Sequence, residues 1–411
     1  MSAMLALPCE IIALIIGQLT GRDLWNIYDC CHHLRACAAR LLFRKATVRF
    51  DESTPILLNG RYFRSPRGGL LQTLSRWSHH VQTLDIWGDE AAIPGEFLDA
   101  LRGLHRLQTV RQVGDDCSIS YPPALSSLQQ LLRQLSCQPT VRTLGVDFMS
   151  PRTWQPQVTF EHLRDLQLSC IEHEPGLCAL PSLPALERLS LNFCCYCLEC
   201  PKTGSGPCTL LLFEQLPRLV SLSISGARKG SVVCRGRASQ LRRLEITFSS
   251  EVDWETLRLT LGCDLEEVII ADCDFVVGWP EPLQRWPRLQ RLHIYDSNSA
   301  VTLLDQVQIP PDTEVHVRIH PADVQDSSQW SMILHALHTV PVTVSFSSHP
   351  DLSYPYLSRL RQLTALGTVQ IDKADCSWFT ACLRELEPAG DCTADLQLTD
   401  LDHVGQIMGG G

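Results

Sequence analysis

A short apolar phrase recurs along this chain and restricts how it can fold. The phrase places an apolar residue, two variable residues, a second apolar residue, one variable residue and a third apolar residue in order. Its middle position recurs at intervals of 22, 23, 33, 22, 24 and 24 residues, on Leu144, Leu166, Leu189, Leu222, Leu244, Val268 and Leu292. The alternation predicts a half-buried strand, and so short a unit buries its apolar face only against its neighbours. The repeats therefore predict a stacked solenoid.

The repeated phrase resembles the leucine-rich repeat, whose units of about 20–29 residues pair one strand with a helix or a turn. The resemblance implies an α/β solenoid with parallel strands on the concave face and helices and turns on the convex face. Helical spacing between phrases, over residues 97–104 and 125–135, agrees with that arrangement. We assign the repeats to residues 81–300 and looser repeats to residues 301–408. Two later helices are expected, over residues 330–337 and 379–386.

Residues 5–44 have a different pattern, with apolar residues at helical spacing in three successive segments. Pro8 suits the first turn of a helix, where its missing N–H is not needed. A unit of about 40 residues has little interior of its own, so part of its apolar surface should dock on a neighbour or a partner. One interpretation is a helical cap on the end of the solenoid, and the other is a docking module. Residues 45–80 are expected to form a helical linker to the solenoid.

The spacing of this N-terminal segment resembles the F-box motif. The matching residues are Leu7-Pro8, Glu10 to Ile12, Leu19, Asp23-Leu24, Cys30, Leu34-Arg35 and Leu41 to Arg44. The segment from Trp25 to Asp29 departs from the motif by placing more polar bulk in the middle helix. F-box helices bind the Skp-family adaptor of cullin-RING ubiquitin ligases. The resemblance therefore implies adaptor contacts by Leu7, Pro8, Ile12, Ile15, Leu19, Leu24 and Leu34.

A target-binding surface is expected on the variable residues within and just after each phrase, because they point away from the solenoid core. The candidates are Trp87, Asp147, Asn192, Thr247, Asp272, Tyr295 and Asp296. A few aromatic and Arg residues dominate protein recognition, and aromatic residues beside acidic ones favour a protein ligand of basic character. The alternative is that aromatic residues just after the phrase, such as Phe193 and Phe248, turn into the core.

The 19 cysteines are too dispersed for a disulfide scaffold and predict reduced thiols, as in the cytoplasm or nucleus. Cys195, Cys197, Cys200 and Cys208 lie close together in the longest repeat and form a candidate zinc loop. The alternative is a thiol-bearing loop without metal. Cys194 and Cys273 fall where the repeat places a side chain that bonds the turn backbone. The run Cys30 to His33 is not expected to bind metal, since consecutive helical residues point in different directions.

Several classes of function are not expected. A net charge of −10, with no block of basic residues, argues against nucleic acid as a partner. No run reaches the roughly 18 apolar residues of a membrane helix, and the apolar start lacks the basic residues of a signal peptide. We find no phosphate loop, dinucleotide fingerprint or nucleophile motif. The sequence therefore favours a non-enzymatic protein without cofactors.

These expectations together favour a substrate-recognition subunit of a Skp, cullin and F-box type ubiquitin ligase, located in the cytoplasm or nucleus. The N-terminal helices would bind the adaptor. The repeats would hold an unidentified protein target near the ubiquitin-charged enzyme, so that catalysis follows from proximity. The alternative is a leucine-rich-repeat scaffold that binds the adaptor without a cullin.

Overall fold

The computed structural model describes residues 7–50, 56–63, 69–88, 93, 95–113, 125–147, 158–171, 178–180, 182–193, 209–227, 232–249, 264–271, 273, 286–296, 303–304, 309–319, 331, 342–346, 370–372 and 397–399. The chain divides into two compact units. Unit 1 comprises Met1–Leu219 with Ser231–Val233, and unit 2 comprises Val220–Gly230 with Cys234–Gly411. Both units contain a sheet of parallel strands.

Unit 1 begins with three short helices, namely α2 (Cys9–Ile16), α3 (Gly21–Cys30) and α4 (His32–Leu42). α2 starts directly after Pro8, whose carbonyl oxygen accepts hydrogen bonds from the N–H groups of Ile11 and Ile12, both at 3.1 Å. Thr20 precedes α3, and its hydroxyl donates to the carboxylate of Asp23 at 2.8 Å. α4 packs against both other helices. Their shared interior contains Ile12, Ile16, Trp25, Leu34, Ala38 and Leu42.

An aromatic cluster joins these helices to the residues that follow. Neighbouring rings of Trp25, Tyr28, Phe43 and Trp77 have centroids 5.3 to 6.1 Å apart. The indole N–H of Trp77 donates to the Tyr28 hydroxyl at 2.8 Å, and that of Trp25 donates to the carbonyl of Asn59 at 3.0 Å. Trp25 and Tyr28 belong to the segment that departs from the F-box motif. Their bulk therefore has a structural role, because it attaches the three helices to the sheet.

The main sheet of unit 1 consists of parallel strands that pair in sequence order. They are β1 (Lys45–Phe50), β4 (Thr83–Gly88), β5 (Thr109–Val113), β6 (Thr143–Val146), β7 (Asp165–Ile171) and β9 (Arg188–Phe193). The middle positions of the repeats lie in register and are buried, in the order Ala46, Leu84, Val110, Leu144, Leu166 and Leu189. The predicted solenoid of parallel strands is confirmed, and it is consistent with the resemblance to leucine-rich repeats.

The sheet begins earlier in the chain than the repeats indicated. β1 pairs with β4 along its whole length, from Lys45 opposite Thr83 to Phe50 opposite Gly88. Two antiparallel strands, β2 (Ile56–Leu58) and β3 (Arg61–Phe63), extend the sheet beyond β1. The expected helical linker over residues 45–80 is therefore largely the first repeat, in which α5 (Leu71–Arg76) and the short helix η2 (Ser78–His80) follow the strands.

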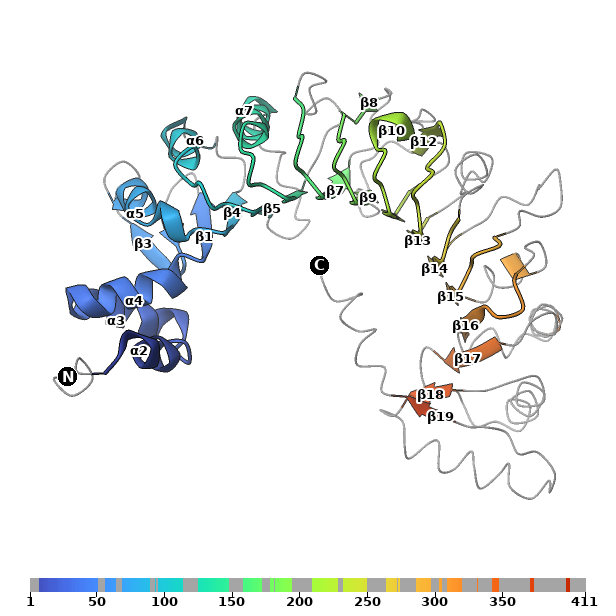
Figure 1. Cartoon of the computed structure of the whole chain (residues 1–411), viewed down its shortest axis with the longest axis horizontal. Helices are drawn as coiled ribbons and strands as arrows, with labels where there is room; N and C mark the ends of the chain where they lie inside the picture. The colour runs from blue at the N-terminus through green and yellow to red at the C-terminus, as the bar shows by residue number, and fades with distance from the viewer. Residues whose placement is uncertain are drawn as a thin grey trace. The chain divides into compact units, whose positions relative to one another are not determined.

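Helices cover one face of this sheet. α5, α6 (Gly95–Leu101) and α7 (Leu125–Ser136) lie side by side (Figure 1). Their apolar sides bury Leu74, Phe97, Leu98, Leu101, Leu128, Leu131, Leu132 and Leu135. The two helices predicted from apolar spacing are present, although α6 already ends at Leu101. Later elements of this layer are β8 (Cys178–Ala179), β10 (Thr209–Leu212), η4 (Phe213–Gln215) and β12 (Val232–Arg235).

Unit 2 continues the repeat pattern with further parallel strands. Its strands are β11 (Ser221–Ser225), β13 (Arg243–Thr247), β14 (Glu267–Ala271), β15 (Arg291–Ile294), β16 (Glu314–Ile319) and β17 (Val342–Phe346). Leu222, Leu244, Val268, Leu292, Val315 and Val342 lie in register. β18 (Gln370–Asp372) pairs with β19 (Gln397–Thr399). The helices expected over residues 330–337 and 379–386 lie outside the described residues, apart from residue 331.

A repeated backbone contact ties each turn of the solenoid to the next. The carbonyl oxygen of Arg44, just before β1, accepts the N–H groups of Gln82 and Thr83, both at 3.0 Å. The carbonyl of Gln82 likewise accepts those of Gln108 at 2.8 Å and Thr109 at 3.0 Å. The same paired contact recurs at the carbonyls of Gln108, Arg142, Arg164, Val220, Arg242 and Glu266. This ladder fixes the position of the residue before each strand.

Cys273 has the structural role predicted from its place in the repeat. Its buried thiol lies 3.2 Å from the carbonyl oxygen of Ala271 and 3.4 Å from that of Ile246, and it donates to these backbone groups. It therefore bonds the turn that follows β14 to the preceding repeat. Cys194, for which the same role was predicted, lies outside the described residues.

Candidate functional site

One side of α2 exposes a row of large apolar side chains. Leu7, Ile11, Leu14 and Ile15 are 38%, 42%, 67% and 43% exposed. The spacing of Ile11, Leu14 and Ile15 places them on one face of α2, and Leu7 lies just before the helix. We call this surface the α2 face. It holds four of the six large apolar side chains found exposed in the described residues, and such a concentration is typical of a docking surface.

The seven residues predicted to contact an adaptor occupy different environments. Leu7, Pro8 and Ile15 are exposed, and Leu19 and Leu24 are half-buried. Ile12 and Leu34 are 0% and 2% exposed. In this arrangement these two cannot contact a partner directly, because they face the interior between α2 and α4. In the structure Ile12 and Leu34 pack in this interior and hold the α2 face in place, and their predicted adaptor contact stays a prediction.

The sequence interpretation did not include Ile11 and Leu14 among the contact residues. Both are more exposed than Leu7, and Leu14 is the most exposed large apolar residue of the α2 face. Apolar residues occur nearly all round α2, so spacing alone did not separate the inner from the outer side. The separating observation is the contact of α2 with α4, which covers only one side of the helix.

The open face of the unit 2 sheet carries a row of alternating charges. Arg243, Glu267 and Arg291 lie opposite one another on β13, β14 and β15. The carboxylate of Glu267 lies 2.8 Å from Arg243 Nη1 and 3.2 Å from Arg291 Nε. Arg243 also lies 3.5 Å from Glu245 on its own strand. Acidic groups are therefore neutralised locally, which reduces the acidic character that a basic target would require at this place.

A cluster of rings follows on the same face, formed by His293, Tyr295 and His316. The ring centroids of these three residues are 5.9 to 6.5 Å apart. Burial is the main cause that lowers the pKa of His316 to about 4, and the positive charges of His293 and Arg318 act in the same direction. Burial also lowers the pKa of His293 and raises that of Tyr295. The ring cluster is therefore uncharged at neutral pH and presents a half-buried aromatic surface.

The predicted target-binding residues are only partly brought together. In unit 2, Tyr295 lies in the ring cluster, and the neighbouring Asp296 is half-buried. In unit 1, Trp87 and Asp147 are half-buried and Asn192 is exposed. Thr247 is only 9% exposed and lies on the same side of β13 as Arg243 and Glu245. Asp272 lies outside the described residues. Phe193 turns into the core at 1% exposure, whereas Phe248 is 49% exposed with a φ of 50°. The sequence did not single out His293 and His316.

The open face of unit 1 contains two ion pairs in place of rings. Lys45 Nζ lies 2.8 Å from the carboxylate of Asp85, which is only 6% exposed. Arg188 forms a two-pronged contact with Asp165, and the hydrogen bond from that carboxylate raises the pKa of Arg188. These pairs connect β1 with β4 and β7 with β9. They stabilise the contact between neighbouring repeats.

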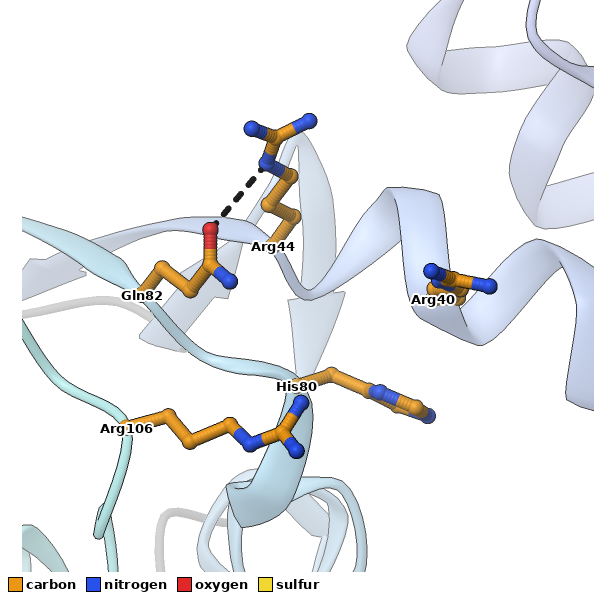
Figure 2. Close-up of a pocket in the computed structure, with 5 residues that line it drawn as sticks. All are labelled: Arg40, Arg44, His80, Gln82 and Arg106. Atoms are coloured by element: carbon orange, nitrogen blue, oxygen red, sulfur yellow. Dashed lines mark hydrogen bonds between the residues drawn. The ribbon is translucent and has the colours of Figure 1, made fainter.

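A small pocket with basic walls opens where α4 meets the first turns of the solenoid. Its lining residues are Arg40, Arg44, His80, Gln82 and Arg106, and its volume is about 240 Å³. We call it the basic pocket. Figure 2 shows Arg40 on α4, Arg44 before β1, and Arg106 extending from the next repeat toward His80. Arg44 Nε donates to the side-chain carbonyl of Gln82 at 3.2 Å. Sequence reasoning missed this pocket, because its residues are dispersed over three repeats.

Two further expectations concern metals and membranes. The candidate zinc ligands Cys195, Cys197, Cys200 and Cys208 lie outside the described residues. Within the described ranges, no three His, Cys, Asp or Glu side chains gather in a group that could hold a metal ion. No helix in the same ranges combines the length and apolar composition needed to cross a membrane.

Comparison with models of known protein families and with curated protein sequences finds no match for this chain. The arguments about function therefore rest on the α2 face, the open faces of the two sheets and the basic pocket.

Proposed function

We propose that this chain is a non-enzymatic binding protein, the substrate-recognition subunit of a Skp, cullin and F-box type ubiquitin ligase. The three N-terminal helices bind the Skp-family adaptor, and the open faces of the strands bind a protein target for ubiquitination. The reaction itself takes place on the partners, and this chain contributes proximity.

The α2 face is the observation that carries this proposal. A helical cap would direct its large apolar side chains toward the solenoid and present a polar outer side. Leu14 and Ile15 are instead 67% and 43% exposed, next to an interior that is already filled by Ile12 and Ile16. This exposed apolar row favours a docking module over a cap. The motif resemblance over Leu7 to Arg44 supplies the chemical class of the partner, an adaptor with its own apolar surface.

The target side of the proposal rests on the ring cluster and the charge row of unit 2. Aromatic side chains that are partly buried in advance lose little conformational freedom when they bind, so they are efficient anchors in protein interfaces. His293, Tyr295 and His316 have this character, and the paired charges of Arg243 and Glu267 border them. We therefore place the target contact on this face, with an aromatic centre and a polar rim.

A binding measurement with a recombinant Skp-family adaptor tests the adaptor half of the proposal. The variant is Leu14→Glu with Ile15→Glu, which places two charges on the α2 face. Burying one such side chain contributes about 1.5–3 kcal/mol, so we expect the affinity to fall more than about tenfold. The matched control is Val220→Glu, which alters an exposed apolar residue of unit 2 that is 40% exposed. It should bind the adaptor like the wild type.

Two results would contradict the proposal. One is a wild-type chain that does not retain the adaptor, and the other is a double variant that retains it as well as Val220→Glu does. A circular dichroism melt of each variant excludes loss of folding as the cause. Co-purification of a cullin with the wild-type complex then separates the ligase subunit from the alternative, an adaptor-bound scaffold without a cullin.

A further inference from the structure

The basic pocket stands out because its charges lack acidic partners in a protein with a net charge of −10. Three guanidinium groups line it, together with an imidazole and an amide, and no carboxylate does. Within the described part of the chain, no carboxylate pairs with Arg40, Arg44 or Arg106. A concave site lined by charges of one sign attracts ligands of the opposite sign.

Two other repeats neutralise an arginine at the same position with a carboxylate. Arg44 directly precedes its strand, as do Arg142, Arg164 and Arg242. Arg142 donates to the carbonyl of His162 at 2.9 Å, and Arg164 pairs with Glu187 at 3.6 Å. Arg242 lies 3.7 Å from Asp264 and 3.4 Å from Glu266. Arg44 contacts only the neutral amide of Gln82, so it lacks the carboxylate partner that Arg164 and Arg242 have at the same repeat position.

A second repeat position brings two further basic residues into the pocket. Asp264 lies three residues before β14, and there it pairs with Arg242 and Arg288. The residues three places before β4 and β5 are His80 and Arg106. This position varies along the repeats, being acidic at Asp264 and basic at Arg288 before β15, and in the pocket two successive repeats both place a basic residue there. Both repeat positions place positive charge at one point, where no described carboxylate lies.

The pocket is also held in one shape. The backbone ladder connects the carbonyl of Arg44 to the N–H of Gln82 at 3.0 Å and the carbonyl of Gln82 to the N–H of Gln108 at 2.8 Å. The His80 ring stacks on Trp77, with centroids 5.8 Å apart and planes 17° apart. Burial lowers the pKa of His80, and the positive charges of His79, Arg40 and Arg106 lower it further. The charges around His80 are therefore close enough to act together on one ligand.

We propose that the basic pocket binds a phosphomonoester dianion. Guanidinium groups present forked N–H donors that match the oxygens of a phosphate group. Because Arg44 uses Nε for Gln82, its terminal N–H groups and the Gln82 amide N–H₂ can donate to the ligand. The volume of about 240 Å³ is below the roughly 300–1,000 Å³ of sites for drug-sized ligands, so the pocket suits one phosphate group. This proposal is independent of the α2 face.

Isothermal titration calorimetry on the full chain tests the proposal, at constant ionic strength with sodium chloride as the balancing salt. The probes are inorganic phosphate, a phosphoserine peptide and the same peptide without phosphate. We expect the two phosphate probes to bind and the unmodified peptide to give no heat. Equal affinity for both phosphate probes would identify a free phosphate compound as the ligand, and tighter binding of the phosphopeptide would identify a phosphorylated side chain.

Two variants separate the pocket from general surface charge. Arg44→Gln with Arg106→Gln should weaken phosphate binding at least about tenfold, because each charge-assisted contact contributes strongly to oxyanion binding. Arg164→Gln with Arg142→Gln removes the same number of charges along the same edge of the sheet. This variant should change the affinity for phosphate less than about twofold. The pKa of His80, followed by NMR, should rise when phosphate binds. Absence of phosphate binding, equal losses in both double variants, or an unchanged His80 pKa would each overturn the proposal.

Discussion

A buried glutamine in β5 provides a quantitative test of the repeat architecture. Gln112 occupies the third apolar position of its repeat, opposite Ile86 on β4 and Val146 on β6. It is 5% exposed, and its side-chain carbonyl oxygen has no hydrogen-bond partner among the described residues. Replacing Gln112 with Leu nearly conserves the side-chain volume and restores the apolar phrase. We therefore expect Gln112→Leu to stabilise unit 1.

The expected size of the effect follows from the chemistry of burial. A buried polar group without a partner costs about 1–3 kcal/mol. A hydrophobic replacement of similar volume creates little strain, usually below about 1.5 kcal/mol. Gln112→Leu should therefore raise the free energy of unfolding by about 1–3 kcal/mol. Gln112→Met, which keeps the unbranched shape of the glutamine, should act in the same direction.

Urea unfolding followed by circular dichroism measures this change as a higher midpoint with an unchanged slope. Gln167→Leu is the matched control, because Gln167 lies on the exposed side of β7 and its substitution should shift stability by less than about 0.5 kcal/mol. A lower midpoint for both Gln112→Leu and Gln112→Met would refute the reasoning. It would mean that the amide forms a hydrogen bond on which the repeat depends.

Two further predictions concern charge. The pKa of His316 is about 4 in the folded protein, against the ordinary value of 6.5 for an unfolded chain. Between pH 4 and pH 6.5 only the unfolded chain therefore binds the proton. The free energy of unfolding falls by about 1.4 kcal/mol per pH unit as the pH decreases through this range. His316→Gln should reduce the pH slope of stability in urea unfolding from pH 4 to pH 7, to which the lowered pKa of His293 also contributes. Equal slopes in both proteins would contradict the burial argument. Lys45→Met leaves the buried Asp85 carboxylate without its ion pair and should destabilise the protein by about 1–3 kcal/mol. Lys45→Met combined with Asp85→Asn should recover most of that loss, and an additive further loss would show that the pair contributes nothing.

The repeat phrase alone predicted most of the strands, because a period of alternating apolar residues depends only on local order along the chain. Strands occur at the phrases around Leu84, Leu189 and Leu292, and after residue 300 at Val315 and Val342. The phrase did not predict the strands β1 and β5. Ala46 replaces the large middle residue in β1, and Gln112 replaces the third apolar residue in β5. These strands form because neighbouring repeats supply their hydrogen bonds and cover their faces.

The inner and outer sides of α2 illustrate a limit of the sequence. Ile11, Ile12, Ile15 and Ile16 are chemically alike, and helical spacing allowed all of them to belong to one wide apolar side. The packing of α4 buries Ile12 and Ile16 completely and leaves Ile11 and Ile15 about two-fifths exposed. The surface available to a partner therefore depends on a contact between helices.

The sequence by itself determined the period of the solenoid, the amphipathic character of the first three helices and the position of Cys273 in a turn. These properties follow from residues close together in the chain. Only the tertiary structure decided which side chains meet across repeats. His293 and His316 become neighbours because they have the same place in successive strands. Arg44 and Arg106 line one pocket because the backbone ladder stacks their repeats. Such sites depend on register between turns, which local periodicity does not specify.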